Sequence, residues 1–135
     1  MKVVNVGIIG GGLMGKEVAG AFGRWFSLND YPVKVELKAV CDLDTNTLKW
    51  YEQIPSVELL TTDYKELLAS PKVDVVYVAL PHFLHEQYYI EVIEAGKDLL
   101  AEKPFGMDLK AAMKINEKIA NSKSFVRCCS EMPFF

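Results

Sequence analysis

Glycines are concentrated in one short loop after the opening apolar run, and their spacing is typical of phosphate binding. The loop consists of Gly10, Gly11, Gly12, Leu13, Met14 and Gly15. In the pattern G-x-G-x-x-G, Gly10 allows a tight turn, Gly12 lets the backbone approach a pyrophosphate, and Gly15 lets the next helix pack closely. The free N–H groups of that helix then point at the phosphates. The alternative is a simple strand-to-helix turn, but the preceding strand and an acid downstream favour phosphate binding.

That acid is Asp42, at the end of the second predicted strand, residues 33–41. A carboxylate there can accept hydrogen bonds from an adenosine ribose and repels a 2′-phosphate, which favours NAD over NADP. Its separation from the glycines exceeds the usual ~20 residues, which we attribute to extra loop residues at 25–32. Two alternatives stay open. Asp42 can be a solvated strand-end residue beside Asp44, and S-adenosylmethionine is a rival ligand for such a loop, although the next motif argues against it.

Polar groups also follow two later predicted strands, as Pro81-His82-Phe83-Leu84-His85 and as Glu102-Lys103-Pro104. Ligands of doubly wound sheets bind beyond the carboxyl ends of the strands, so both segments are expected to line one crevice. The ammonium of Lys103 can hold a substrate hydroxyl and lower its pKa. The Lys103–Pro104 peptide bond is a candidate for the cis form.

Each of these residues also has a simpler interpretation. Lys103 can be a solvated loop lysine that pairs with Glu102 at little energetic gain. His82 and His85 are spaced as metal ligands on one side of a helix, but no third ligand is evident. A helix cap or a cofactor contact is the favoured role for the histidines, and no metal site is predicted.

Short apolar runs rich in Val, Ile and Leu alternate with amphipathic stretches along the whole chain. Strands are predicted at residues 3–9, 33–41, 57–60, 73–80, 98–101 and 124–130. Helices are predicted at residues 13–25, 44–53, from 63 onward, 82–95 and 108–120. This order predicts an α/β fold, a doubly wound and mostly parallel sheet that forms one domain over residues 1–135.

The last predicted helix carries an apolar stripe that is expected to face the core. The stripe consists of Leu109, Ala112, Met113, Asn116, Ile119 and Ala120. Asp108 is expected to cap this helix, and Gly96 is expected to end the helix before it.

Composition excludes several classes of function. The 135 residues carry 15 basic and 18 acidic side chains, a net charge of −3, without a basic cluster, so neither nucleic acid nor an anionic membrane surface is an expected partner. No apolar run approaches the ~20 residues that span a bilayer, and a cytoplasmic protein is expected. The three cysteines, Cys41, Cys128 and Cys129, lack paired spacing and are expected to be reduced, buried thiols. The apolar end at Pro133-Phe134-Phe135 suggests a piece of a longer protein.

Together the motifs resemble the glucose–fructose oxidoreductase/inositol dehydrogenase/MocA family, and the resemblance covers nearly all of the chain. It is carried by the glycine loop, Val40-Cys41-Asp42-Leu43-Asp44, residues 73–81, His85, and Ala95-Gly96-Lys97 through Glu102-Lys103-Pro104. The resemblance implies a Rossmann NAD(P)-binding domain that is normally followed by an α+β domain, absent here. It also implies hydride transfer between a nicotinamide cofactor and a secondary alcohol of a sugar, polyol or cyclitol. The whole protein is expected to be a homo-oligomer.

The resemblance further assigns roles to residues. Lys103 matches the catalytic lysine of the family. The cofactor is expected to contact Gly10, Gly11, Gly12, Leu13, Met14, Gly15, Asp42, Leu80, Pro81, His82, His85, Glu102, Lys103 and Pro104.

Two departures from the family pattern stand out. Leu80-Pro81-His82 replaces a frequent Thr-Pro-Asn, and Glu131-Met132-Pro133 lacks a common arginine. This chain alone is expected to bind cofactor but to turn over poorly. The alternative is a non-catalytic regulatory protein that senses nucleotide, although the presence of Lys103 favours the enzyme.

Overall fold

A computed structural model of the chain describes residues 1–24 and 32–130. The predicted loop at residues 27–31, the predicted helix end at Trp25 and the apolar end at residues 133–135 lie outside the described residues, as does the segment 131–133 that lacks the arginine.

The described residues form one parallel sheet. Its strands are β1 (Lys2–Ile9), β2 (Val33–Cys41), β3 (Leu59–Thr61), β4 (Val75–Val78), β5 (Asp98–Glu102) and β6 (Val126–Cys129). They lie in the order β3-β2-β1-β4-β5-β6, and every neighbouring pair is parallel. The order reverses between β1 and β4, which is the point where ligands bind in doubly wound sheets. The predicted α/β fold is confirmed.

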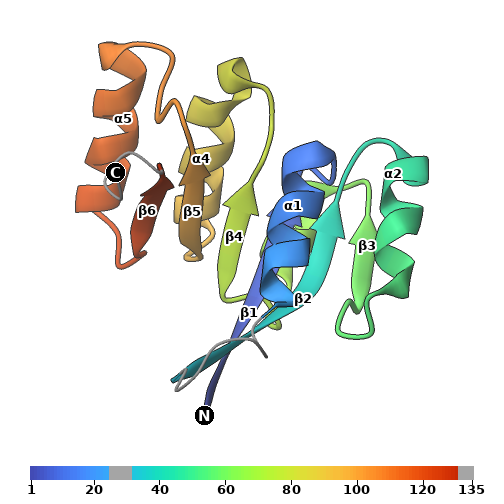
Figure 1. The fold of residues 1–135 in the computed structure, drawn as a ribbon. Helices are drawn as coiled ribbons and strands as arrows, with labels where there is room; N and C mark the ends of the chain where they lie inside the picture. Colours follow the sequence, from blue (N-terminus) through green and yellow to red (C-terminus); the bar gives the residue numbers. More distant parts are fainter. Residues whose placement is uncertain (25–31, 131–135) are drawn as a thin grey trace.

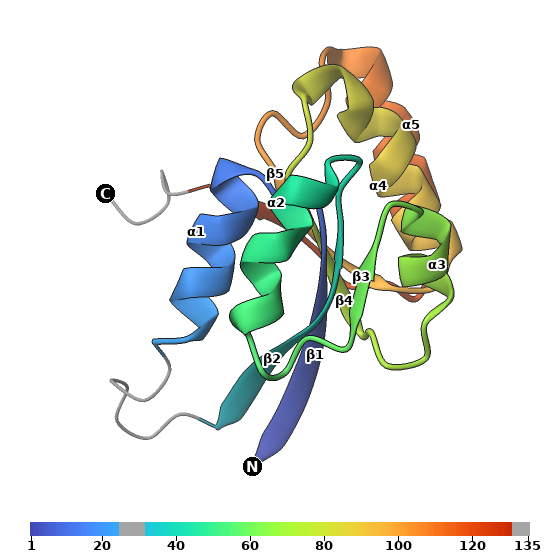
Figure 2. The same cartoon turned by 90° about the vertical axis from the view of Figure 1, so that its right-hand side faces the viewer.

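Helices cover both faces of this sheet. They are α1 (Leu13–Phe22), α2 (Thr45–Lys49), the 3-10 helix η2 (Trp50–Gln53), α3 (Tyr64–Ala69), the 3-10 helix η3 (His82–Leu84), α4 (His85–Glu94) and α5 (Leu109–Ala120). Figure 2 shows α1 and α2 on one side of the sheet and α3, α4 and α5 on the other. Each strand from β1 to β5 is followed by an α-helix, in one case through the turn η3, so the connections return along the outside of the sheet.

Two apolar clusters form the core, one on each face of the sheet. Successive residues of β4 alternate between them: Val76 and Val78 pack with α4, whereas Tyr77 packs in the cluster that contains Ile8 and Tyr51. Strands covered on both sides must be apolar at nearly every position, which explains the continuous apolar runs of the sequence.

Local signals fix the ends of several helices. The carboxylates of Asp44, Asp63 and Asp108 each accept a hydrogen bond from a backbone N–H in the first turn of the helix that follows. Gly96, at φ +72°, ends α4 as predicted. The predicted helix at 82–95 begins as the separate turn η3, and the predicted helix at 44–53 continues after Lys49 as η2.

One predicted packing face was right only in part: Ile119 packs against the core, but other residues of the predicted stripe do not. In α5 the buried residues are Ala111 and Ile115, whereas Leu109 and Met113 are exposed. The helix carries apolar residues on two stripes, and the stripe of Ala111, Ile115 and Ile119 is the one that faces the core on the α4 side of the sheet. Cys41 is a buried free thiol, as predicted, while Cys128 and Cys129 are free but only half-buried.

Candidate functional site

The glycine loop joins β1 to α1 at the carboxyl end of the sheet, the upper edge in Figure 1. Gly10 has φ +97°, and a Cβ there would lie 2.3 Å from the carbonyl oxygen of Ala79. A Cβ on Gly15 would lie 2.4 Å from the carbonyl oxygen of Gly10, so a side chain would push α1 away from the strand. Both glycines are therefore required by the protein itself.

Gly12 differs from these two glycines. A Cβ on Gly12 would meet nothing within 4 Å, so the space beside it is open. Gly12 is the N-cap of α1, and no side chain of the described residues caps this helix. The first-turn N–H groups of a helix are free donors at the positive end of its dipole. This end of α1 therefore fits an anionic group such as a pyrophosphate.

Asp42 lies directly beside the loop. Its Oδ2 accepts a hydrogen bond from the N–H of Gly11 at 2.8 Å, and its Oδ1 accepts one from the N–H of Asp44 at 2.8 Å. A carboxylate has about four acceptor positions, so capacity for further donors such as hydroxyls is left. The structure thus brings together the glycines and the acid that sequence places 31 residues apart.

Tyr51, on η2, supports the loop from below and was not singled out from the sequence. Its hydroxyl donates to the carbonyl oxygen of Gly11 at 2.9 Å, and the side chain is fully buried. Burial, with a smaller contribution from the charge of Asp42, raises the pKa of Tyr51. Nothing in the local sequence distinguishes this tyrosine from a core aromatic residue, because its partner is distant in the chain.

A cavity of about 330 Å³ opens next to Asp42, between the ends of β1, β2 and β4. Its lining includes the predicted residues Gly10, Asp42, Leu80 and Pro81, together with Cys41, Leu43, Thr62, Tyr64, Leu84 and Tyr88. The rings of Tyr64 and Tyr88 lie 4.8 Å apart. Thr62 was not singled out from the sequence, although it directly follows β3 and the rule that ligands bind at the carboxyl ends of strands could have pointed to it. The tyrosines gave no such signal.

Most ionisable side chains that line this cavity are thiol or phenol groups with raised pKa values. Burial raises the pKa of the Cys41 thiol to about 11, and the nearby carboxylate of Asp42 adds to this effect. A hydrogen bond to Glu91, followed by burial, raises the pKa of Tyr64 to about 12. Asp42 is therefore the principal charge at this part of the described crevice.

The segments that follow β4 and β5 also begin at this edge of the sheet. Lys103 is exposed, and its peptide bond to Pro104 is cis, as predicted. Glu102 is half-buried, and its Oε1 accepts a hydrogen bond from the hydroxyl of Tyr77 at 2.7 Å. His82 is exposed on η3.

His85 has a different environment from His82. It is 1% exposed, and its Nδ1 and Nε2 lie 2.8 Å and 3.0 Å from the carbonyl oxygens of Pro104 and Leu80. Both ring nitrogens are therefore engaged by the protein. In residues 1–24 and 32–130, no group of three or more His, Cys, Asp or Glu side chains is placed to hold a metal ion.

Comparison with known proteins decides the family. The oxidoreductase family GFO_IDH_MocA, with an NAD-binding Rossmann fold, matches residues 4–128. The chain belongs to this family. The resemblance inferred from the motifs is confirmed.

Curated relatives of the family are oxidoreductases. The uncharacterized oxidoreductase YrbE of Bacillus subtilis (strain 168) is 31% identical over 108 residues, which are 80% of this chain and 30% of YrbE. The D-xylose 1-dehydrogenase (NADP(+)) of Hypocrea jecorina is 44% identical over 63 residues, which are 47% of this chain and 16% of that enzyme.

Solved structures of the family have the same fold. Levoglucosan dehydrogenase in complex with NADH and L-sorbose matches with a TM-score of 0.82 and 26% identity, over 93% of this chain and 35% of that one. Myo-inositol 2-dehydrogenase from Lactobacillus plantarum matches with a TM-score of 0.83 and 25% identity, over 99% of this chain and 38% of that one. This chain thus spans less than two fifths of the length of each of these four proteins.

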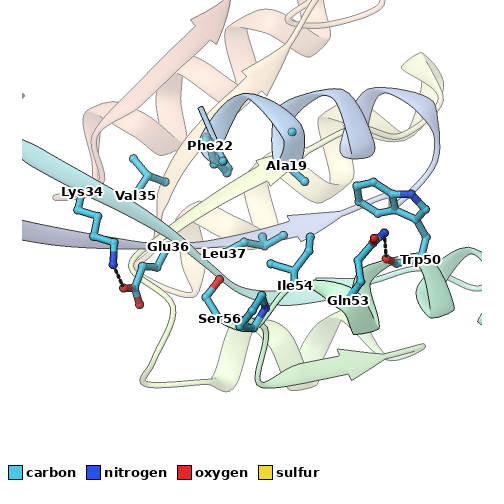
Figure 3. A pocket seen from close by; sticks show the side chains of 13 residues that line it. Ala19, Phe22, Lys34, Val35, Glu36, Leu37, Trp50, Gln53, Ile54 and Ser56 are labelled. Carbon is cyan, nitrogen blue, oxygen red and sulfur yellow. Dashed lines mark hydrogen bonds and ion pairs between the residues drawn. The ribbon is translucent and has the colours of Figure 1, made fainter. Parts of the chain in front are cut away.

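A larger groove exists, but it does not lie at the carboxyl edge of the sheet. This groove, of about 570 Å³, lies between α1, β2 and η2, toward the amino end of β2 (Figure 3). Its wall is largely apolar, with Ala19, Phe22 and Leu37 among its residues, and the ions Lys34 and Glu36 pair with each other. The smaller cavity beside Asp42 lies at the carboxyl ends of the strands and contains a carboxylate, so it is the candidate site. Among the described helices, none is long and apolar enough to cross a membrane.

Proposed function

We propose that this chain is the cofactor-binding domain of an NAD-dependent dehydrogenase that acts on a secondary alcohol of a sugar, polyol or cyclitol. One observation carries the proposal: open space beside Gly12, at an uncapped helix N-terminus, lies next to a carboxylate that is fixed by Gly11. This arrangement fits the two halves of an adenosine diphosphate group, because the helix end suits the phosphates and the carboxylate suits ribose hydroxyls.

Different residues of the crevice would bind different parts of the cofactor. Residues 10–15 would hold the pyrophosphate with backbone N–H groups, and Asp42 would accept hydrogen bonds from the adenosine ribose. The cavity lined by Thr62, Tyr64 and Tyr88 would receive the adenine ring. Leu80 and Pro81 follow β4, Glu102 is the last residue of β5, and all three would border the nicotinamide half. The nicotinamide, when bound, supplies the acceptor for a hydride from the alcohol carbon.

Asp42 favours NAD over NADP. The 2′-phosphate of NADP would bring a second anion to the carboxylate, and like charges at this range repel each other. The family itself does not decide the cofactor, because one relative is named as an NADP(+) enzyme and another structure contains NADH.

Lys103 would orient the substrate. Its exposed ammonium group can donate a hydrogen bond to the alcohol oxygen and stabilise the negative charge that develops there as the hydroxyl proton is released to water. The substrate's identity and the homo-oligomeric state remain predictions for the whole protein.

Calorimetric titration of the chain with NAD and with NADP tests the cofactor assignment. We expect tighter binding of NAD. Tighter binding of NADP would contradict the role of Asp42, and absence of binding by both would contradict the proposed function of the chain.

Turnover is tested in the whole protein with a panel of sugars and polyols. K103A is expected to lower kcat by about 10²–10⁴-fold while NADH still binds. K110A, at an exposed position on α5, is the matched control for loss of a lysine. NAD binding without turnover of any alcohol would support a nucleotide-sensing regulator instead.

A further inference from the structure

We propose that His85 and Tyr89 position Lys103 by holding the backbone on both sides of it. The two residues, here called the His85–Tyr89 clamp, lie one turn apart on α4. The inference rests on the proposed role of Lys103 and adds two residues of α4 that do not themselves touch the substrate.

Tyr89 holds the residue before Lys103. Its side chain is 0% exposed, and its hydroxyl donates a hydrogen bond to the carbonyl oxygen of Glu102 at 2.7 Å. Burial is the main cause that raises the pKa of Tyr89, so the hydroxyl keeps the proton that it donates.

His85 holds the residue after Lys103. Its Nδ1 lies 2.8 Å from the carbonyl oxygen of Pro104, and its Nε2 lies 3.0 Å from that of Leu80. One ring thus links the segment after β5 to the end of β4. Carbonyl oxygens only accept hydrogen bonds, so a neutral ring donates to one of these two carbonyls and only an imidazolium donates to both. The contact with Pro104 requires the proton on Nδ1.

The two side chains support each other. Their rings stack at a centroid distance of 4.8 Å with an interplanar angle of 26°, and the ring of Phe105 lies 6.0 Å from that of Tyr89. Because both partners are buried, a shift of one ring requires a shift of the other.

Lys103 is consequently fixed at its backbone, while its side chain makes no hydrogen bond or ion pair with the residues that the structure describes. A third contact, from Tyr77 to the carboxylate of Glu102, also restrains the preceding residue. Only the side-chain torsions of Lys103 remain to be ordered when a substrate binds. A group that is prepositioned in this way acts with a smaller entropic cost, which is the value of support around a site.

The simpler interpretation is that these hydrogen bonds only satisfy buried polar groups of the core. Under that interpretation, breaking them lowers the stability of the whole domain without a specific effect at Lys103. The two interpretations therefore differ in where the effect of a substitution is found.

Four variants separate them. Y89F removes the hydroxyl and keeps the stacked ring. H85N retains a donor near the position of Nδ1, toward Pro104, whereas H85Q retains one near the position of Nε2, toward Leu80. I115V is the control, because Ile115 is fully buried on α5 in the same apolar cluster as Tyr89 but has no side-chain group that can hydrogen-bond to residues 102–104.

The first measurement is backbone ¹⁵N relaxation in this chain. In Y89F and H85Q we expect the order parameter of Lys103 to fall from the rigid range, about 0.85, to below about 0.6. H85N should change it less, and I115V should leave it unchanged. Unchanged order parameters in both Y89F and H85Q, or equal effects of H85N and H85Q, would overturn the proposal.

The second measurement is steady-state kinetics of the whole protein. We expect Y89F and H85Q to lower kcat by about tenfold or more with little change in KM, since small misplacements of a positioned group are costly. Kinetics indistinguishable from those of I115V would overturn the proposal. If wild-type protein binds neither NAD nor NADP, the proposed function fails, while the relaxation data still decide whether α4 holds the backbone at Lys103.

Discussion

At the scale of single residues, the glycine loop separates what the fold needs from what the ligand needs. Gly10 has a left-handed backbone and a carbonyl group against it, so the folded chain itself requires a glycine. Gly12 has neither constraint, and a side chain there would only enter open space. A glycine without a structural reason at a helix N-terminus is best explained by a ligand that must come close.

Alanine substitutions test this difference. G10A is expected to lower the free energy of unfolding by about 3 kcal/mol, because it combines an unfavourable φ with a steric overlap. G12A is expected to cost under about 1 kcal/mol, as at other N-caps, yet to weaken NAD binding more than about tenfold. Urea unfolding and NAD titration of both variants measure these effects. Normal NAD binding by G12A would place the pyrophosphate elsewhere.

Asp42 is the second residue whose role is separable. D42N removes the charge but keeps the size, so the repulsion of a 2′-phosphate is lost. We expect the ratio of NAD to NADP affinity to fall by about tenfold to hundredfold, the range of a like-charge contact near a protein surface. D44N is the matched control, because asparagine caps a helix as well as aspartate does. An unchanged ratio in D42N would show that another residue selects the cofactor.

At the scale of elements, α5 shows how packing selects one of two apolar stripes. Ala111 and Ile115 lie against the α4 side of the core, while Leu109 and Met113 are 76% and 64% exposed. Ion pairs between α5 and α4, from Lys114 to Glu86 and from Lys118 to Glu94, lie along the same boundary. These exposed ion pairs contribute little stability, so the buried stripe holds the helix.

Substitutions on the two stripes of α5 should differ clearly. I115A is expected to lower the free energy of unfolding by about 2–5 kcal/mol, the usual cost of a cavity at a buried isoleucine. L109Q and M113Q should each change it by less than about 0.5 kcal/mol, as at other exposed positions. Urea unfolding of the chain provides the comparison. A larger loss in L109Q than in I115A would mean that the stripe assignment is reversed.

At the scale of the whole molecule, the double layer of helices buries ionisable side chains in both halves of the core. Burial is the largest cause that raises the pKa of the thiols of Cys41 and Cys129 to about 11, from near 9. The pKa values of Tyr77 and Tyr89 are raised in the same direction, again chiefly by burial. All four groups remain neutral in the folded protein at pH values where the unfolded chain ionises.

The domain should therefore be sensitive to alkali. For each raised thiol, the folded state binds the proton more tightly than the unfolded state, so the stabilising contribution is complete below about pH 9 and is lost as the pH rises toward 11. In this range each thiol should lower the free energy of unfolding by about 1 kcal/mol per pH unit. Urea unfolding across the range measures the slope, and C129A should reduce it. A stability that is constant up to pH 11 would contradict the burial of these thiols.

The sequence by itself determined the fold class, the glycine loop and the strand-end positions of Asp42 and Lys103. These features depend on local patterns: continuous apolar runs for doubly covered strands, N-cap aspartates, and glycines at a strand-to-helix turn. The rule that ligands bind at the carboxyl ends of parallel strands then placed these residues on one edge without any coordinates.

Only the tertiary structure decided which distant side chains support that edge. Tyr51 under Gly11, and His85 and Tyr89 around Lys103, act through hydrogen bonds between residues that are far apart in the chain. The inward stripe of α5 was also decided there, because a helix with two apolar stripes fits its neighbours in only one rotation. Local sequence patterns show how often buried residues recur along a helix or strand. Which residue each side chain contacts, and which face of a helix turns inward, depend on how the elements pack.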